Sequence, residues 1–197
     1  MTGPVKVILH GLTDPAQARE AGALGIDAAS VVLGDGGLPA VPPERAVAVA
    51  AALPPLTARL ALVAPGGALP AGFTGAVTGL DDERPEGAAV HIVRVPHTPV
   101  DPERIPADID AVWLAPRPGT GSATGFDFTR IGRLATWFRV VLEVPDGAAG
   151  VEAAIRLGRP YAVVLGEAVW YQPGIVDLDR LEKALAVVAR LNKLAFG

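Results

Sequence analysis

The chain alternates short apolar, β-branched runs with alanine-rich stretches of helical period, and this alternation limits its fold more than any other feature. Such a pattern predicts strands joined by crossover helices in a parallel sheet. The expected strands are 5–9, 28–33, 59–63, 76–78, 90–95, 111–114, 139–143 and 161–165. Eight strands in 197 residues favour one α/β domain, a (β/α)8 TIM-type barrel spanning residues 1–197. The alternative is an open doubly wound sheet with fewer strands.

The helices that join these strands are expected to form an incomplete ring. Helices are predicted at 14–24, 43–53, 128–137, 150–157 and 178–194. Thr13 or Asp14 is the expected N-cap of the first, with Pro15 in its first turn. Residues 64–75 and 84–87 carry Gly and Pro where the third and fourth helices would lie, so those two helices are expected to be shortened or missing. Only a short helix is expected within 101–109, because Pro106 interrupts it.

The missing helices have a consequence for assembly. The strands of a parallel barrel are normally buried on both faces, so residues 60–63 and 90–95 would lose their outer cover. Exposed apolar patches of this kind often mark interfaces, which favours a homodimer that pairs the two faces. In the alternative, the loops fold back over the strands with Leu69 and Phe73 as plugs, and a monomer is permitted.

Composition excludes several classes of function. No apolar run approaches the ~18 residues of a membrane-spanning helix, and the N-terminus lacks signal-peptide features, so we expect a cytoplasmic protein without a membrane partner. The absence of cysteine excludes disulfides and thiol nucleophiles. A net charge of -4 without a cluster of Lys or Arg argues against a nucleic-acid partner. No cofactor is expected, because no dinucleotide or phosphate-cradling glycine motif occurs.

Several segments, in a shared order across nearly the whole chain, carry a resemblance to a known family. They are VILHGLTDP at 7–15, VPPERA at 41–46, GTG at 119–121, FDF at 126–128, AIR at 154–156, RPY at 159–161 and PGIVD at 173–177. Together they resemble phosphoribosylanthranilate isomerase. This resemblance implies a (β/α)8 barrel and an Amadori rearrangement of phosphoribosylanthranilate.

The chain departs from the family pattern at the positions that carry the chemistry. The family uses a cysteine base after strand one and an aspartate acid after strand six, and the resemblance aligns these with His10 and Ala115. A strand-eight aspartate aligns with Val164, and an arginine after strand two falls near Pro39.

The phosphate-binding segments of the family are also replaced. Its Gly-Gly after strand seven aligns with Val144 and Pro145, and proline has no N–H to donate. Its Ser-Ser-Gly after strand eight reads Gly-Glu-Ala, which puts the Glu167 carboxylate where a phosphate would bind. The usual isomerase reaction is therefore not expected.

Two residues at strand ends are candidate catalytic groups. His10 has an ordinary imidazole pKa near ~6.5, so it could exchange a proton near neutrality, or it could be a hydrogen-bonded structural histidine. Glu143 ends an apolar strand and could pair with His10, act as an acid with a raised pKa, or be a solvated strand end. The spacing of His10, Glu143 and Glu167 is not a metal motif, and no metal site is expected.

The remaining polar groups at strand ends are candidates for substrate binding. They are Asp35, Arg117, Thr120, Gly121, Glu167, Trp170 and Tyr171. Arg117 could bind a carboxylate, or form a surface salt bridge. Glu167 with Trp170 and Tyr171 would suit a flat or cationic ligand, or pack the last loop.

The leading hypothesis is a phosphoribosylanthranilate isomerase-like barrel recruited to different acid–base chemistry. It would isomerise, cyclise or eliminate from a non-phosphorylated small molecule, as an isomerase or lyase in specialised biosynthesis. The alternatives are a non-catalytic barrel that binds a ligand or partner, and a divergent but genuine phosphoribosylanthranilate isomerase.

Overall fold

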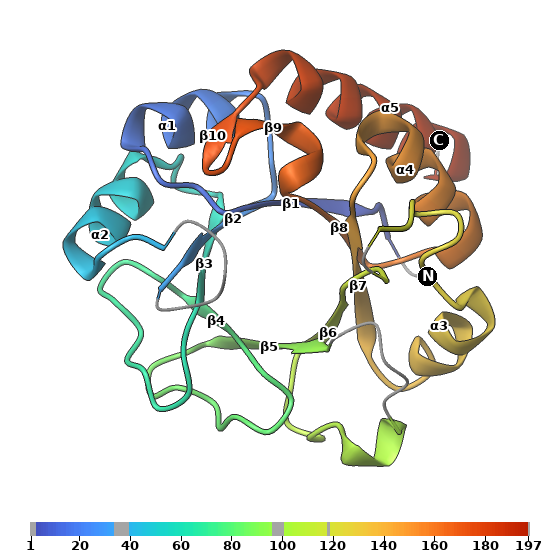
Figure 1. Cartoon of the computed structure of the whole chain (residues 1–197), viewed down its shortest axis with the longest axis horizontal. Coiled ribbons are helices and arrows are strands. Elements are labelled where there is room, and N and C mark those ends of the chain that lie inside the picture. The colour runs from blue at the N-terminus through green and yellow to red at the C-terminus, as the bar shows by residue number, and fades with distance from the viewer. Residues whose placement is uncertain (1–2, 34–39, 96–100, 118, 197) are drawn as a thin grey trace.

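Eight parallel strands form a closed barrel in chain order, β1 to β8, in a computed structural model that describes residues 3–33, 40–95, 101–117 and 119–196 (Figure 1). The strands are β1 Lys6–His10, β2 Ala28–Val32, β3 Ala58–Leu62, β4 Gly75–Thr78, β5 Val90–Val95, β6 Ala111–Leu114, β7 Arg139–Val144 and β8 Ala162–Leu165. The TIM-type barrel is confirmed, and every strand end lies within one residue of its expected position.

The helices surround the barrel except beside β3, β4 and β5 (Figure 1). They are α1 Pro15–Ala23, α2 Pro43–Ala52, α3 Phe128–Leu134, α4 Gly147–Ala153 and α5 Leu178–Phe196. α1 begins as expected, because the Asp14 carboxylate accepts hydrogen bonds from the backbone N–H groups of Ala16, at 2.8 Å, and Gln17, at 3.1 Å. α4 continues into a π-helical turn, Ala154–Gly158, which ends at Arg159 in the left-handed conformation with φ 45°.

Several short elements complete the chain. Two 3-10 turns span Pro102–Arg104 and Glu167–Val169. The first is all that forms of the helix expected within 101–109. A hairpin of β9, Trp170–Gln172, and β10, Ile175–Val176, follows β8 and was not expected from the sequence. Among the described residues, no helix combines the length and the apolar character that a bilayer crossing requires.

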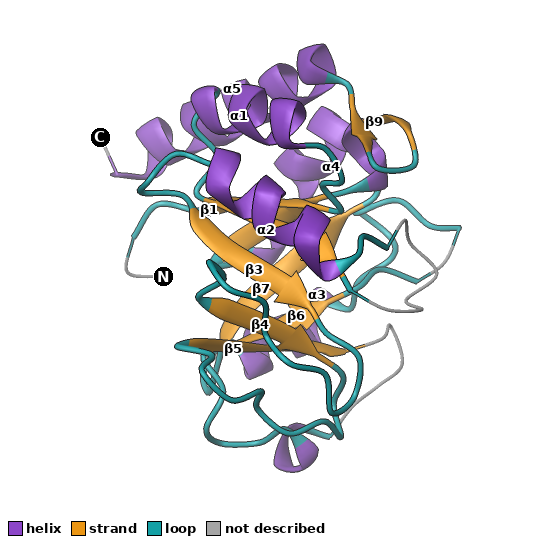
Figure 2. Ribbon diagram, turned by 90° about the vertical axis from the view of Figure 1, so that its left-hand side faces the viewer, coloured by secondary structure: helices purple, strands orange, loops and turns teal. Residues whose placement is uncertain are grey.

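Loops replace helices on the side of the barrel formed by β3, β4 and β5 (Figures 1 and 2). Residues 63–74 and 79–89, all of them described, contain no helix, as the Gly and Pro residues predicted. The outer faces of the strands are nevertheless covered: Val63 and Val93 are buried, and Phe73 packs against them in the same core with only 8% of its surface exposed. The outer faces of these strands are therefore covered by the chain's own loops, and a second protein chain is not needed to bury them. The homodimer stays a prediction without this support, and sedimentation at micromolar concentration would distinguish it from the 20.2 kDa monomer.

Side chains from alternate strands fill the barrel in layers, and only the last layer is strongly polar. The register of the strand pairs sets these layers. The first consists of Ile8, Leu60, Ile92 and Val141; the second of Ser30, Val77, Trp113 and Val164; the third, at the carboxyl ends of the strands, of His10, Leu62, Arg94 and Glu143. The register thus concentrates ionisable groups at the mouth of the barrel.

We predict that Phe73→Ala lowers the free energy of unfolding by about 3 kcal/mol, because it removes a buried aromatic ring from the outer cover of the barrel. Leu56→Ala is the matched control, since Leu56 is 98% exposed and its removal is expected to change stability by less than about 0.5 kcal/mol. Urea denaturation of both variants measures the difference. Equal stability of the two would contradict the role assigned to Phe73.

Candidate functional site

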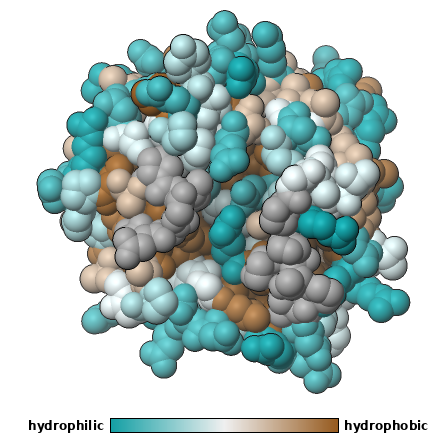
Figure 3. Space-filling view, in the orientation of Figure 1, coloured by the Kyte–Doolittle hydropathy of each residue, from teal (hydrophilic) through white to brown (hydrophobic). Residues whose placement is uncertain are grey.

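A cavity of about 350 Å³ lies at the carboxyl ends of β5 to β8. Its lining includes Arg94, Ala115, Arg117, Thr120, Glu143 and Glu167. In this architecture the carboxyl ends of the strands carry the functional groups, so the position of the cavity is that of an active site. Figure 3, in the orientation of Figure 1, shows hydrophilic residues along the middle of the face with apolar residues on both sides.

The charge network of the mouth is centred on Glu143. One carboxylate oxygen, Oε2, accepts hydrogen bonds from Arg94 Nη2 at 3.1 Å and from Trp113 Nε1 at 2.9 Å. The guanidinium of Arg94 also lies over the indole ring, 5.9 Å from its centroid. Glu143 therefore pairs with an arginine from β5 and an indole from β6, and no direct contact joins it to His10.

Sequence reasoning missed Arg94. The signal was present in the inward alternation of β5, where positions 90, 92 and 94 face the barrel interior. With the register known, that alternation puts Arg94 in the same layer as Glu143.

His10 is buried beneath the mouth, with 2% of its surface exposed. Its Nδ1 is hydrogen-bonded to Ser30 Oγ at 2.6 Å, and its ring meets Trp113 edge-on at 4.9 Å between centroids. Burial, with a smaller contribution from the positive charge of Arg94, lowers the pKa of His10 to about 3. The imidazole is thus neutral at physiological pH. The expected proton exchange near neutrality does not hold for this buried state.

The second ring nitrogen of His10, Nε2, has no hydrogen-bond partner among the described residues. The ring is not part of the cavity lining, but it lies next to Gly166, which is. A Cβ at Gly166 would lie 3.7 Å from His10 Cδ2. Because glycine has no side chain, the backbone of Gly166 lies between the cavity and the imidazole of His10.

Beside the cavity, the loop after β7 carries the carboxylate of Asp146, which is hydrogen-bonded to Ser122. Asp146 Oδ2 accepts a hydrogen bond from the backbone N–H of Ser122 at 3.0 Å, and Oδ1 accepts one from Ser122 Oγ at 2.5 Å. A Cβ on Gly121 would lie only 2.6 Å from Asp146 Oδ2, so Gly121 accommodates this carboxylate. Pro145, which lines the cavity, has no N–H to offer an anion.

The structure separates the residues expected to form an aromatic pocket. Glu167 lines the cavity, but the Trp170 indole is buried against Gly11, and Tyr171 on β9 is 77% exposed. Asp35 lies outside the described residues. The three-residue pocket for a flat or cationic ligand is therefore not formed in this arrangement.

Arg117 and Thr120 do line the cavity, and the Thr120 hydroxyl donates a hydrogen bond to the Arg117 carbonyl at 2.6 Å. Arg94, Glu143 and Glu167 line the same small space. Such a site can bind a polar molecule that has both hydrogen-bond donors and acceptors. Over the described ranges, no three His, Asp or Glu side chains are grouped so as to hold a metal ion.

Comparisons with known proteins extend over nearly the whole chain. No protein-family model matches it. The N-(5'-phosphoribosyl)anthranilate isomerase of Acidithiobacillus ferrooxidans is 29% identical in an alignment 201 positions long that covers 93% of this chain and 97% of the relative. The crystal structure of phosphoribosylanthranilate isomerase from Thermus thermophilus superposes with a TM-score of 0.75 at 28% identity, covering 95% of this chain and 100% of that one. The chain has the fold of the phosphoribosylanthranilate isomerase family.

A less similar solved structure, of a differently named enzyme, has a similar barrel. A thiamine phosphate pyrophosphorylase from Pyrococcus furiosus has a TM-score of 0.68 at 13% identity, covering 95% of this chain and 96% of that one. Likeness at this level concerns the fold alone, since one barrel hosts many reactions. Function depends on the residues at the mouth of the barrel.

We predict that His10 makes the protein acid-sensitive. The unfolded chain protonates His10 near pH 6.5, whereas the folded state resists protonation until about pH 3, so stability is lost as the pH falls from 6.5 toward 3. Between pH 7.5 and 5, this group alone should lower the free energy of unfolding by about 2 kcal/mol.

Denaturation of wild type and His10→Gln at both pH values measures this contribution, and the loss is expected to be smaller in the variant. Ser30→Ala is the matched control, because it removes the hydrogen bond but keeps the imidazole and its acid sensitivity. Parallel pH profiles for wild type and His10→Gln would contradict the lowered pKa.

Proposed function

We propose that this isomerase-like barrel carries out acid–base chemistry on a small polar molecule that has no phosphate group. The observation that carries the proposal is the composition of the mouth. It has an arginine-bound carboxylate and a buried imidazole beside the cavity, and the Glu167 carboxylate lines the cavity where the family resemblance implies a phosphate site, with Asp146 in the neighbouring loop.

Glu143 is the proposed proton-transfer group. Its Oε2 is fixed by Arg94 and Trp113, while Oε1 has no hydrogen-bond partner among the described residues and is available to a substrate. A carboxylate oriented in this way can take a proton from carbon, nitrogen or oxygen and return it to a neighbouring atom. Isomerisation, cyclisation and elimination all consist of such transfers.

His10 has a different proposed role from that of a base. In a neutral imidazole whose Nδ1 is hydrogen-bonded to Ser30, one nitrogen, Nε2, is left to form a hydrogen bond. The bond to Ser30 also fixes the orientation of the ring and therefore the direction of Nε2. A substrate group that reaches past Gly166 would be hydrogen-bonded and oriented there. Arg117 would bind a carboxylate or another polar acceptor on the same substrate.

Electrostatics argues against a phosphate in this site. Two unit charges of the same sign at about 4 Å repel by roughly 4 kcal/mol at an effective dielectric constant of 20. Glu167 and Asp146 both stand on the loops where the phosphate of a family member would be expected. Pro145 supplies no compensating N–H.

A second candidate is a genuine phosphoribosylanthranilate isomerase. The Acidithiobacillus relative, 29% identical over 93% of this chain, favours it. The third candidate is a barrel that binds a ligand without catalysis, favoured by the absence of an acid at Ala115 and by the burial of His10 Nε2.

We predict that the purified protein does not isomerise phosphoribosylanthranilate and does not restore growth without tryptophan to a strain that lacks this step. Anthranilate fluorescence follows turnover, and the same sugar without its phosphate is assayed in parallel. Efficient turnover of the phosphorylated substrate would identify the second candidate and overturn the proposal. Any turnover that occurs is expected to show no preference for the phosphate.

We also predict that the phosphate corner can be rebuilt. The probe is reduced 1-(o-carboxyphenylamino)-1-deoxyribulose 5-phosphate, with which a solved phosphoribosylanthranilate isomerase was crystallised. The double variant Pro145→Gly/Glu167→Ser adds an N–H and removes a negative charge, so its affinity for the probe should exceed that of wild type at least about tenfold.

Calorimetry measures both affinities. Glu103→Ser removes the same charge from an exposed position on the first 3-10 turn, and it should leave the affinity unchanged. Tight binding of the probe by wild type, with no gain in the double variant, would show that the phosphate corner still functions.

A further inference from the structure

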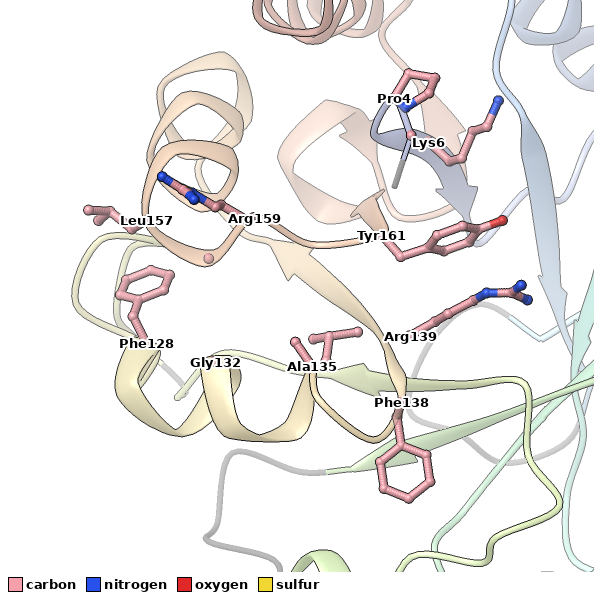
Figure 4. A pocket seen from close by; sticks show the side chains of 13 residues that line it. Pro4, Lys6, Phe128, Gly132, Ala135, Phe138, Arg139, Leu157, Arg159 and Tyr161 are labelled. Carbon is pink, nitrogen blue, oxygen red and sulfur yellow. The ribbon is translucent and has the colours of Figure 1, made fainter. Parts of the chain in front are cut away.

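A second cavity, of about 600 Å³, lies at the opposite end of the barrel from the mouth (Figure 4). It is bounded by α3, by the turn that follows α4 and by the starts of β1 and β7. Because catalysis in this architecture takes place at the carboxyl ends of the strands, a cavity at their amino ends is independent of the active site.

The walls of this lower cavity are apolar and its floor is made of small residues. Phe128 and Leu157 stand on one side and Tyr161 on the other, above Gly132 of α3 and Ala135, which follows this helix (Figure 4). A Cβ built on Gly132 would meet no atom within 4 Å, so the space over the helix is open. The open space over Gly132 can hold a flat ring beside Phe128.

The charged groups of the lower cavity are all cationic. Lys6, Arg139 and Arg159 line it, and no carboxylate does, although the chain as a whole has a net charge of -4. Lys6 is paired with Asp27 at 2.9 Å. Within the described ranges, Arg139 and Arg159 form no salt bridge, and the Arg139 guanidinium lies over the Tyr161 ring, 5.2 Å from its centroid. Arg159 therefore remains available to an anion, whereas Arg139 is stacked on Tyr161 on the other side of the cavity (Figure 4).

The backbone at Arg159 is a second, independent observation. This residue ends the turn after α4 with φ 45° and ψ 52°, and Arg159 is the one described residue other than glycine with a positive φ. Glycine is the residue that usually ends a helix in this conformation, because it has no Cβ to strain. The chain instead has a guanidinium here, at the edge of an apolar cavity.

We propose that the lower cavity binds a small planar aromatic carboxylate as a non-catalytic ligand. The ring would lie over Gly132 beside Phe128, and the carboxylate would pair with the planar guanidinium group of Arg159. The lining holds no carboxylate or imidazole that could act as a general acid or base, so the site binds its ligand without transforming it.

The test uses 1-naphthoate as the probe and its neutral amide, 1-naphthamide, as the matched ligand, with calorimetry on the full chain. Naphthoate is expected to bind with one site per chain and at least tenfold more tightly than the amide. Arg159→Gly is expected to weaken naphthoate binding about tenfold while leaving the thermal unfolding midpoint unchanged or higher. Gly132→Leu, which fills the space over the helix, should weaken both ligands.

Two control variants test whether naphthoate binds in the lower cavity rather than elsewhere on the molecule. Arg133→Gln removes a charge from the exposed surface of the same helix without touching the cavity lining, and should leave the affinity unchanged. Arg117→Gln removes a cation from the mouth and should also leave it unchanged. The proposal is overturned if naphthoate does not bind, if the amide binds equally well, if Arg159→Gly binds with wild-type affinity, or if only Arg117→Gln weakens binding.

Discussion

The ion pair between Arg94 and Glu143 is the interaction on which the mouth of the barrel depends. A carboxylate in a barrel interior is costly unless it is paired and hydrogen-bonded, and Glu143 has both an arginine and an indole as partners. The same contacts fix Trp113, whose ring meets His10 edge-on. Residues from β1, β5, β6 and β7 are therefore positioned by one carboxylate, and the electrostatics of the site follow from it.

The fold of this barrel and the chemistry of its mouth depend on different sets of residues. The layers of Ile, Leu and Val side chains below the mouth need only volume and alternation, which many sequences supply. The loops above them carry the specific groups, such as Asp146 and Ser122, which are hydrogen-bonded to each other. Fold and activity are thus determined by different residues, and the 29% identity to one isomerase supports the fold without deciding the activity.

The sequence predicted the strands and helix starts well because these depend on local patterns, such as the carboxylate of Asp14 ahead of Pro15. It predicted the site less well because the site depends on register. Arg94 and Ser30 were missed since nothing local says which inward positions of neighbouring strands share a height. The neutral state of His10 depends on burial, and the orientation of Trp170 depends on Gly11, which leaves space for the indole. Neither effect is local in sequence.

The loops that replace helices beside β3, β4 and β5 affect how the barrel moves as well as how it packs. Helices add hydrogen bonds and broad apolar contact to the strands that they cover, whereas these loops contribute a few plugs such as Phe73. Regions with fewer such contacts open locally at a lower free energy than the rest of a domain. We therefore expect β3, β4 and β5 to unfold locally at a lower free energy than the helix-covered strands β7, β8, β1 and β2.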